Sequence, residues 1–510
     1  MSAAAASHRR SQGGGEASGL LVPVLMGVTM VTGIISSLGA PLIPSVARSL
    51  HITLDSAQWS LTVALLSGAI SAPVLGRLGD GLHRRPTILG GLAIVFAGSI
   101  IAGLAHSLPV LVVGRTMQGV GLGIAPATMA AARDHLPRER STAVIGLLSV
   151  AGAAAVGAGY PISGLIASDV GLHAAFFFGA LMSGIALLAA FMVIPSSVTS
   201  GGASLDVRGT LVVALGLTAL LLAIGQGQQW GWGSATIIGL FVAAAVVLGV
   251  WVRMQLSARA PLVELRLLRH RAVLTADLAA VMLGLAMYMF FTLVTEFVQE
   301  PRALGYGLSA STLVAGFCLV PFSVMSLLAS RTAPSLTRRL SASTVLVCGS
   351  LVIAAAGAFF ALLHGALWEA LVAMGVIGVG FGYTFAAIPG MIARAVPSGE
   401  TGSAMGLYQV IRSVGFSLGS ALAASILAGA TVGADVAERG YVTALWVGTA
   451  ACVISAAASW LLSRGVDRAS PGAMSSGERD AMAVEDAELA SAGLVGIEGE
   501  QRPTRAQRPT

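Results

Sequence analysis

The sequence predicts an all-α polytopic membrane protein. About fourteen apolar stretches of roughly twenty residues recur between positions 20 and 465, and a helix of that length crosses a hydrocarbon core of about 30 Å. The composition agrees, because 55% of the residues are hydrophobic and only 10% are charged, which excludes an ordinary water-soluble domain. The stretches lack the alternation of barrel strands. Helices remain, since only helices and closed barrels satisfy their backbone hydrogen bonds in lipid.

The stretches fall into groups of six, two and six, which predicts two six-helix bundles and an inserted pair. The expected spans are 20–42, 57–77, 87–106, 110–131, 142–166, 173–195, 210–225, 234–255, 272–299, 310–330, 342–363, 367–392, 402–429 and 441–463. In each group of six, an arginine-bearing loop follows the second stretch and the fifth stretch is rich in glycine. This weak repeat indicates two related halves with a site between them, as in many secondary transporters.

The domain boundaries follow from this grouping. We expect an N-terminal segment at 1–19, a first bundle at 20–195, an inserted segment with a linker at 196–271, a second bundle at 272–465 and a tail at 466–510. The tail has few large apolar residues, so we expect it to be disordered.

Most arginines fall in the connections on one side of the membrane, whereas Arg48, Arg302 and Arg439 fall on the other. The positive-inside rule then predicts a cell-membrane protein with both termini in the cytoplasm.

The most specific motif follows the second expected span, and it reads Gly76-Arg77-Leu78-Gly79-Asp80-Gly81-Leu82-His83-Arg84-Arg85-Pro86. It resembles the signature of the major facilitator superfamily, and the matching residues are Gly76, Asp80, Arg84 and Arg85. Gly81 and His83 depart from the signature. Asp80 lies at a helix boundary beside arginines, where it can make charge-assisted hydrogen bonds that hold one conformation. We expect a gating role for this loop, and a purely topological role for Arg84 and Arg85 is the alternative.

Arg115 lies several residues inside the fourth expected span. A buried guanidinium is costly in lipid unless it faces a cavity or a partner. The stretch Arg115-Thr116-Met117-Gln118-Gly119 resembles a second motif of the same superfamily, and the resemblance implies a part in proton transfer or in cavity electrostatics. A structural hydrogen bond between helices is the alternative.

The fifth expected span resembles the glycine-rich antiporter motif of drug exporters. Its matching residues are Gly152, Gly157, Gly159, Pro161 and Gly164. Pro161 stands two positions after Gly159, and Ser163 replaces a glycine of the motif. Proline bends a helix and glycine permits close approach, so the segment is expected to act as a hinge or as a sealed interface between halves. Packing of small residues without such a role is the alternative.

Over 20–465 the chain resembles the fourteen-span drug:proton antiporter family. One departure matters, because the acidic residue that this family commonly carries in its first span is replaced here by Ile35. Proton coupling would then need another group. The candidates within the spans are Asp277 and Glu296, with Arg412 as a cation that could pair with a carboxylate. A carboxyl group in a dry cavity binds its proton more tightly, which suits proton exchange.

These features predict a proton-driven exporter of small amphipathic compounds that works by alternating access. An uptake permease or facilitator of the same fold is one alternative, and a non-transporting membrane sensor is another.

The expected partners are a small-molecule substrate, protons and the lipid bilayer, with no nucleic acid, metal or cofactor, and the protein is expected to be monomeric. We expect no enzyme, because His51 and Asp55 stand without any catalytic motif. Since acids are scarce in the spans, dications should be poor substrates.

Overall fold

The computed structural model describes residues 2–38, 42–80, 83–195, 206–258, 261–263, 265–396, 400–432 and 435–463. Within these ranges, 14 helical segments are long and apolar enough to cross a membrane. The predicted fold class, an all-α polytopic membrane protein with fourteen spans, is therefore confirmed. The expected tail at 466–510 lies outside the described residues, as does most of the connection after the sixth span.

The helices follow the expected order of six, two and six. The first bundle consists of α1 (Ser2–Ser37), α3 (Leu54–Leu78), α4 (Arg84–Gly103), a span made of α5 (Leu108–Gly119), η2 (Val120–Gly123) and α6 (Ile124–His135), α7 (Arg138–Asp169) and α8 (Leu172–Val193). The inserted pair is α9 (Val207–Trp230) and α10 (Ala235–Ser257). The second bundle consists of α11 (Arg271–Phe297), a span made of α12 (Thr312–Phe317) and α13 (Val320–Arg339), α14 (Ala342–Leu362), α15 (Leu367–Ala395), α16 (Thr401–Gly429) and α17 (Glu438–Ser463).

Short elements connect the spans. They are α2 (Ile43–Leu50), η3 (Leu265–Arg269), η4 (Arg302–Leu304) and the antiparallel strands β1 (Thr431–Val432) and β2 (Asp435–Val436). Several boundaries differ from those expected. Helix α1 ends at Ser37, before the expected limit at 42, and the tenth span breaks ahead of Pro321 and then continues to Arg339. Hydropathy does not detect the polar end of α13, so the expected span stops too early. The break falls at Pro321 because proline lacks the backbone N–H, and at the start of a helix that N–H has no partner in any case.

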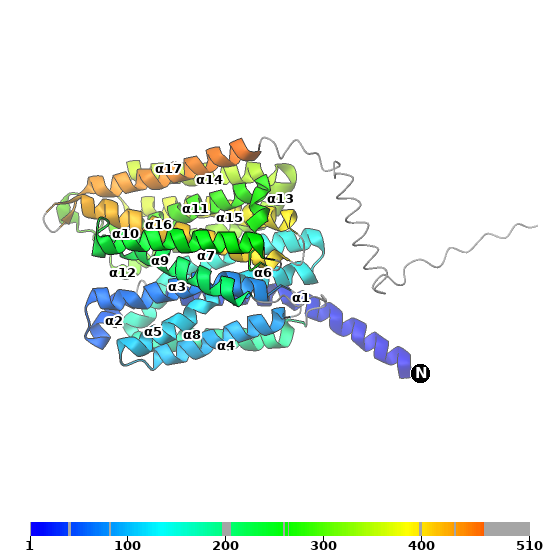
Figure 1. Ribbon diagram of the computed structural model, residues 1–510. Coiled ribbons are helices and arrows are strands. Elements are labelled where there is room, and N and C mark those ends of the chain that lie inside the picture. Colours follow the sequence, from blue (N-terminus) through cyan, green and yellow to red (C-terminus); the bar gives the residue numbers. More distant parts are fainter. Residues whose placement is uncertain are drawn as a thin grey trace, which may run out of the picture. The chain divides into compact units, whose positions relative to one another are not determined.

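The two bundles meet along α3 and α16 on one side, and along α7 with α13 and α15 on the other. In Figure 1 the blue and cyan helices of the first bundle lie below the green to orange helices of the second. The inserted helix α9 packs against both α3 and α16, beside their contact. A small apolar cluster joins the three helices, and its members include Ala72, Val213, Leu217 and Val410. The inserted pair thus lies over the line where the two halves meet.

Within the second bundle, α11 and α16 approach closely because glycines line the contact. A Cβ atom at Gly419 would overlap the carbonyl oxygen of Leu285, and one at Gly415 would overlap that of Val281. Such close backbone packing replaces the hydrophobic effect as the force that holds helices together in lipid. Both helices also line the cavity between the halves.

We predict that Gly419→Ala lowers the stability of the folded protein by about 1–3 kcal/mol, because the added methyl group has no space. The measurement is the thermal unfolding temperature of the purified protein in detergent. Gly164→Ala is the matched control, since a Cβ at this helical glycine meets nothing within 4 Å. Equal unfolding temperatures for the two variants would contradict the close approach of α11 and α16.

Candidate functional site

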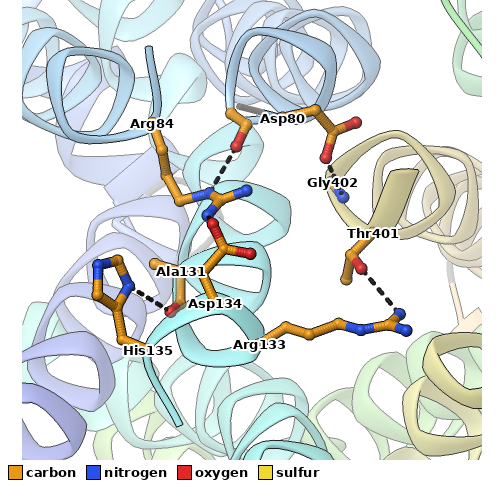
Figure 2. Close-up of polar contacts among 9 residues, drawn as sticks. Asp80, Arg84, Ala131, Arg133, Asp134, His135, Thr401 and Gly402 are labelled. Carbon is orange, nitrogen blue, oxygen red and sulfur yellow. Dashed lines mark hydrogen bonds and ion pairs between the residues drawn. The ribbon is translucent and has the colours of Figure 1, made fainter. Parts of the chain in front are cut away.

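Asp80 joins the two halves of the molecule at one end, which we call the Asp80 end. Its Oδ1 accepts a hydrogen bond from the backbone N–H of Gly402 at 2.7 Å. Its Oδ2 accepts from the N–H of Ser403 at 2.9 Å and from the hydroxyl of Ser403 at 2.6 Å. Figure 2 shows this carboxylate directed at the start of α16. Because Glu400, the residue before α16, makes no capping hydrogen bond, Asp80 of the first bundle caps a helix of the second.

Opposing effects act on the charge of the Asp80 carboxyl group. Asp80 is 2% exposed, and this burial raises the pKa of its carboxyl group above the ordinary value. The donors of Ser403 and Gly402 and the charge of Arg84 act in the opposite direction. A helix N-terminus also favours a negative charge. The closed arrangement therefore holds a carboxylate at a desolvation cost, and the hydrogen bonds offset much of that cost.

Two arginines, Arg84 and Arg133, lie beside the contact between Asp80 and α16 (Figure 2). The buried Arg84 donates from Nε to the carbonyl oxygen of Gly79 at 2.6 Å and forms an ion pair with Asp134 at the end of α6. Arg84 thus positions the turn that carries Asp80. Arg133 reaches across to the second bundle, where it donates to the hydroxyl of Thr401 at 2.9 Å and to the carbonyl oxygen of Val396 at 2.8 Å. We call Asp80, Arg133 and their partners in the second bundle the seal.

Two glycines allow the helices to meet at the seal. A Cβ atom at Gly76 would overlap the carbonyl oxygen of Gly402, and a Cβ atom at Gly402 would overlap that of Gly76. The predicted motif residue Gly76 therefore lies at the seal with Asp80. Arg85 lies elsewhere: it donates to the carbonyl oxygen of Phe191 in α8 at 2.8 Å and stacks on the ring of that residue, within the first bundle.

A cavity of about 370 Å³ lies between the halves, farther from the Asp80 end than the seal is. Its walls come from α1, α3, α7, α11 and α16, and include Thr29, Gln58, Tyr160, Tyr288, Glu296 and Arg412. A separate hollow of about 560 Å³ lies at the Asp80 end between α7, α13 and α15, and none of its lining residues lines the cavity. On α16 the cavity lining begins at Gln409, whereas Gly402 and Ser403 of the seal precede it, so the seal is nearer the Asp80 end than the cavity is.

Arg412 forms part of the cavity lining on α16 and is 6% exposed. Its guanidinium donates to Gln409 Oε1 at 2.5 Å, to the hydroxyl of Tyr408 at 3.2 Å and to the hydroxyl of Ser149 at 3.3 Å. Ser149 belongs to α7, so this last bond also joins the halves. Within the described residues, no carboxylate lies within 4 Å of Arg412.

The two candidate carboxylates lie in different surroundings on α11. Glu296 lines the cavity and also a surface depression near Tyr441, which hydrogen-bonds Glu300 at 2.7 Å. Asp277 is 4% exposed, and neither of its carboxyl oxygens has a hydrogen-bond partner among the described residues. It does not line the cavity. Glu296 is thus the carboxylate that a substrate or water in the cavity can reach.

Arg115 lies inside the first bundle and not in the cavity wall. It is fully buried, and it donates to the carbonyl oxygen of Ser60 at 3.1 Å, to Gln118 Oε1 at 2.7 Å and to the carbonyl oxygen of Ile35 at 3.4 Å. The arginine therefore meets the first helix at the position where the related family commonly has an acid, but it meets only a backbone dipole there. Gln118 in turn donates a hydrogen bond from Nε2 to the hydroxyl of Ser99 at 2.9 Å.

The glycine-rich motif of α7 faces several neighbours. Gly157 lies against Ser323 of α13, and Gly159 lies against Ser37 of α1, so each of these glycines permits a close approach. Pro161 lies beside Gly316 of α12. A Cβ added at Gly152 would meet Thr29 at ordinary van der Waals distance, and one added at Gly164 would meet nothing within 4 Å. The motif therefore packs α7 against both halves, although Gly164 does not take part in that packing.

Some site residues were not among the sequence candidates. Asp134, Thr401 and Ser403 complete the seal region, and Tyr288 and Gln409 line the cavity. Their residue types are common in loops and helices, so no local pattern singles them out. Ser403 could have been found only from its place at a helix start, where an external carboxylate is favoured.

Two helical bundles with a polar cavity between them and a seal that joins them at the Asp80 end are an arrangement typical of membrane transporters. The chain belongs to the Major Facilitator Superfamily, whose family model matches residues 25–420 and 336–483. This membership confirms the resemblance stated from the sequence, and it excludes the enzyme hypothesis because members of the family are transporters.

Relatives and solved structures agree with that assignment. The tetracenomycin C resistance and export protein of Streptomyces glaucescens is 28% identical, over 80% of this chain and 75% of its own length. An uncharacterized MFS-type transporter of Mycobacterium tuberculosis (strain CDC 1551 / Oshkosh) is 30% identical over 57% of this chain, and the match spans 42% of that relative. The proton:xylose symporter XylE shares the fold, with a TM-score of 0.59 and 14% identity over 88% of this chain and 96% of its own.

We predict that Asp80→Asn opens the Asp80 end. The amide loses one acceptor and turns N–H donors toward the donors of α16, which should disfavour the closed state by about 2 kcal/mol, roughly thirtyfold in population. Spin labels at Arg140 and Arg339, in a background without the cysteines Cys318, Cys348 and Cys452, report the distance between the halves. Asp206→Asn is the matched control, since Asp206 caps the start of α9 through the N–H of Gly209 at 2.9 Å without joining the halves. An unchanged distance distribution in Asp80→Asn would refute the gating assignment.

Proposed function

We propose that the protein is a proton-driven exporter of small amphipathic compounds that works by alternating access. The observation that carries the proposal is a cavity between two halves together with a seal at the Asp80 end, where Asp80 accepts hydrogen bonds from the start of α16. The arginines of the connections favour a cytoplasmic location for the Asp80 end and for both termini. The arrangement then corresponds to a state closed toward the cytoplasm.

Export is favoured over uptake by two observations. The relative from Streptomyces glaucescens is by its name a resistance and export protein, and the glycine-rich α7 resembles the motif of exporters. Uptake by the same fold remains the second candidate, because XylE is by its title a proton:xylose symporter. A non-transporting sensor would have no use for a seal that must break and re-form.

Glu296 is the group that we propose as the proton-coupling carboxyl. It lines the cavity, whereas Asp277 is enclosed and Ile35 carries no charge. A carboxyl group in a partly dry cavity gains and loses a proton as the cavity wets, which links protonation to the conformation. Asp277 has no acceptor or donor partner among the described residues, and its role is proposed to be secondary.

The direction of transport is tested in inverted membrane vesicles with an imposed gradient, acid inside. The probes are ethidium as a monocation, fluorescein as an anion and N-phenyl-1-naphthylamine as a neutral compound. We expect accumulation of at least one probe together with collapse of the pH gradient, relative to vesicles without the protein. Probe movement in the opposite direction would indicate a symporter, and the absence of any movement with all three would contradict the transport proposal.

We predict that Glu296→Gln abolishes accumulation driven by the pH gradient but preserves exchange of labelled for unlabelled probe, because binding and switching persist without the titrating group. Asp277→Asn is the control on the same helix, and its effect on gradient-driven accumulation should be less than about threefold. The two rates are measured side by side in proteoliposomes. Full coupling in Glu296→Gln would place the proton site elsewhere.

A further inference from the structure

The base of the cavity combines a buried cation with neutral polar groups and aromatic rings. We infer that the cavity binds organic acids, with the acidic group of the ligand paired to Arg412 and its aromatic body against the rings above it. This inference names the substrate class of the site and rests on the proposed transport function. Its test is a binding measurement, so that it can fail while transport itself is established.

The first argument is the unpaired charge of Arg412. All three of its hydrogen-bond acceptors are neutral, and its Nε has no acceptor among the described residues. The rings of Phe385, Tyr408 and Phe416 lie 5.3, 5.1 and 5.5 Å from the guanidinium carbon. Rings and hydroxyls stabilise a cation less well than a carboxylate does in a low-dielectric site. An anion that enters the cavity gains a bidentate partner that the protein does not supply.

The second argument is the distance to the acid in the cavity wall. A Cβ at Gly284 would lie 2.8 Å from the carbonyl oxygen of Arg412, so these two positions are level on α11 and α16. From position 284 to position 296 a helix rises about 18 Å. Glu296 therefore cannot neutralise Arg412. The cavity is polar along its length, with the cation at its base and the acid far above it.

The third argument concerns the body of the ligand. The rings of Tyr288 and Phe416 lie 4.6 Å apart above Arg412, and Tyr160 faces the same space from α7. A volume of about 370 Å³ is within the range of sites for one drug-sized molecule. A compact aromatic or fused-ring compound that carries a carboxylate, phenolate or enolate fits both the charge and the walls. A flexible dication fits neither.

Acid binding at this point would act on the conformational switch. Arg412 donates to Ser149 of the other half at 3.3 Å, so it belongs to the contacts that join the halves below the cavity. An anion that draws the guanidinium away from Ser149 removes one of these contacts. A substrate with this charge therefore changes the balance between closed and open states, which a neutral compound of equal shape does not.

The test compares 9-anthracenecarboxylate with the neutral 9-anthracenecarboxamide, which share a fluorescent ring system. Binding to the purified full-length protein in lipid nanodiscs is measured at neutral pH by fluorescence anisotropy. For the unmodified protein we expect the acid to bind at least tenfold more tightly than the amide. Equal affinity of the two compounds, or tighter binding of the amide, would overturn the inference without any variant.

Two substitutions separate the charge from the packing of Arg412. Arg412→Gln should remove the preference for the acid, whereas Arg412→Lys should keep most of it although the planar hydrogen bonds to Tyr408 and Gln409 are lost. Glu296→Gln, at the far end of the cavity, should leave the preference in place. Each variant is first checked for monodispersity and for an unfolding transition like that of the parent. Retention of the full acid preference in a folded Arg412→Gln protein would assign the anion to another group.

Discussion

The structure depends on one carboxylate that caps a helix of the opposite half. Asp80 accepts the N–H groups of Gly402 and Ser403, which are among the donors that a helix start leaves unsatisfied. The contact requires glycine at positions 76 and 402, because a side chain on either would hold the helices apart. Burial raises the pKa of Asp80, and its hydrogen bonds and the charge of Arg84 oppose this effect.

The buried charges around the cavity are the basis of the proposed substrate class. Arg115 and Arg412 are buried cations with neutral acceptors, and within the described residues the cavity wall offers Glu296 as its acid. The replacement of the usual acid by Ile35 leaves Arg115 facing a backbone carbonyl group. We therefore propose that the site favours anions over dications, since an uncompensated charge in a low dielectric is costly. Arg412 and the seal both join the halves, so in this proposal the charge of the substrate acts on the conformational change.

The sequence predicts the spans well and the site only in part. Hydropathy identifies all fourteen segments, since lipid requires long apolar helices, but it misses the break between α12 and α13 and the polar end of α13. The loop motif points to Asp80 and Gly76. It cannot identify their partner, because Gly402 and Asp80 lie 322 positions apart in the chain and meet only through tertiary packing. The motif also includes Arg85, whose contact with Phe191 lies within one bundle, and a role of Arg85 in gating stays a prediction.

The most direct test of the account is a double-mutant cycle on Asp80 and Ser403, read from the closed fraction in the spin-label distance distribution. Asp80→Asn, Ser403→Ala and the double variant are compared with the parent protein. If the carboxylate and the helix start form one unit, the two changes are non-additive by about 1 kcal/mol or more in the free energy of closure. Strictly additive effects would show that Asp80 acts on closure without this bond, and would contradict the account.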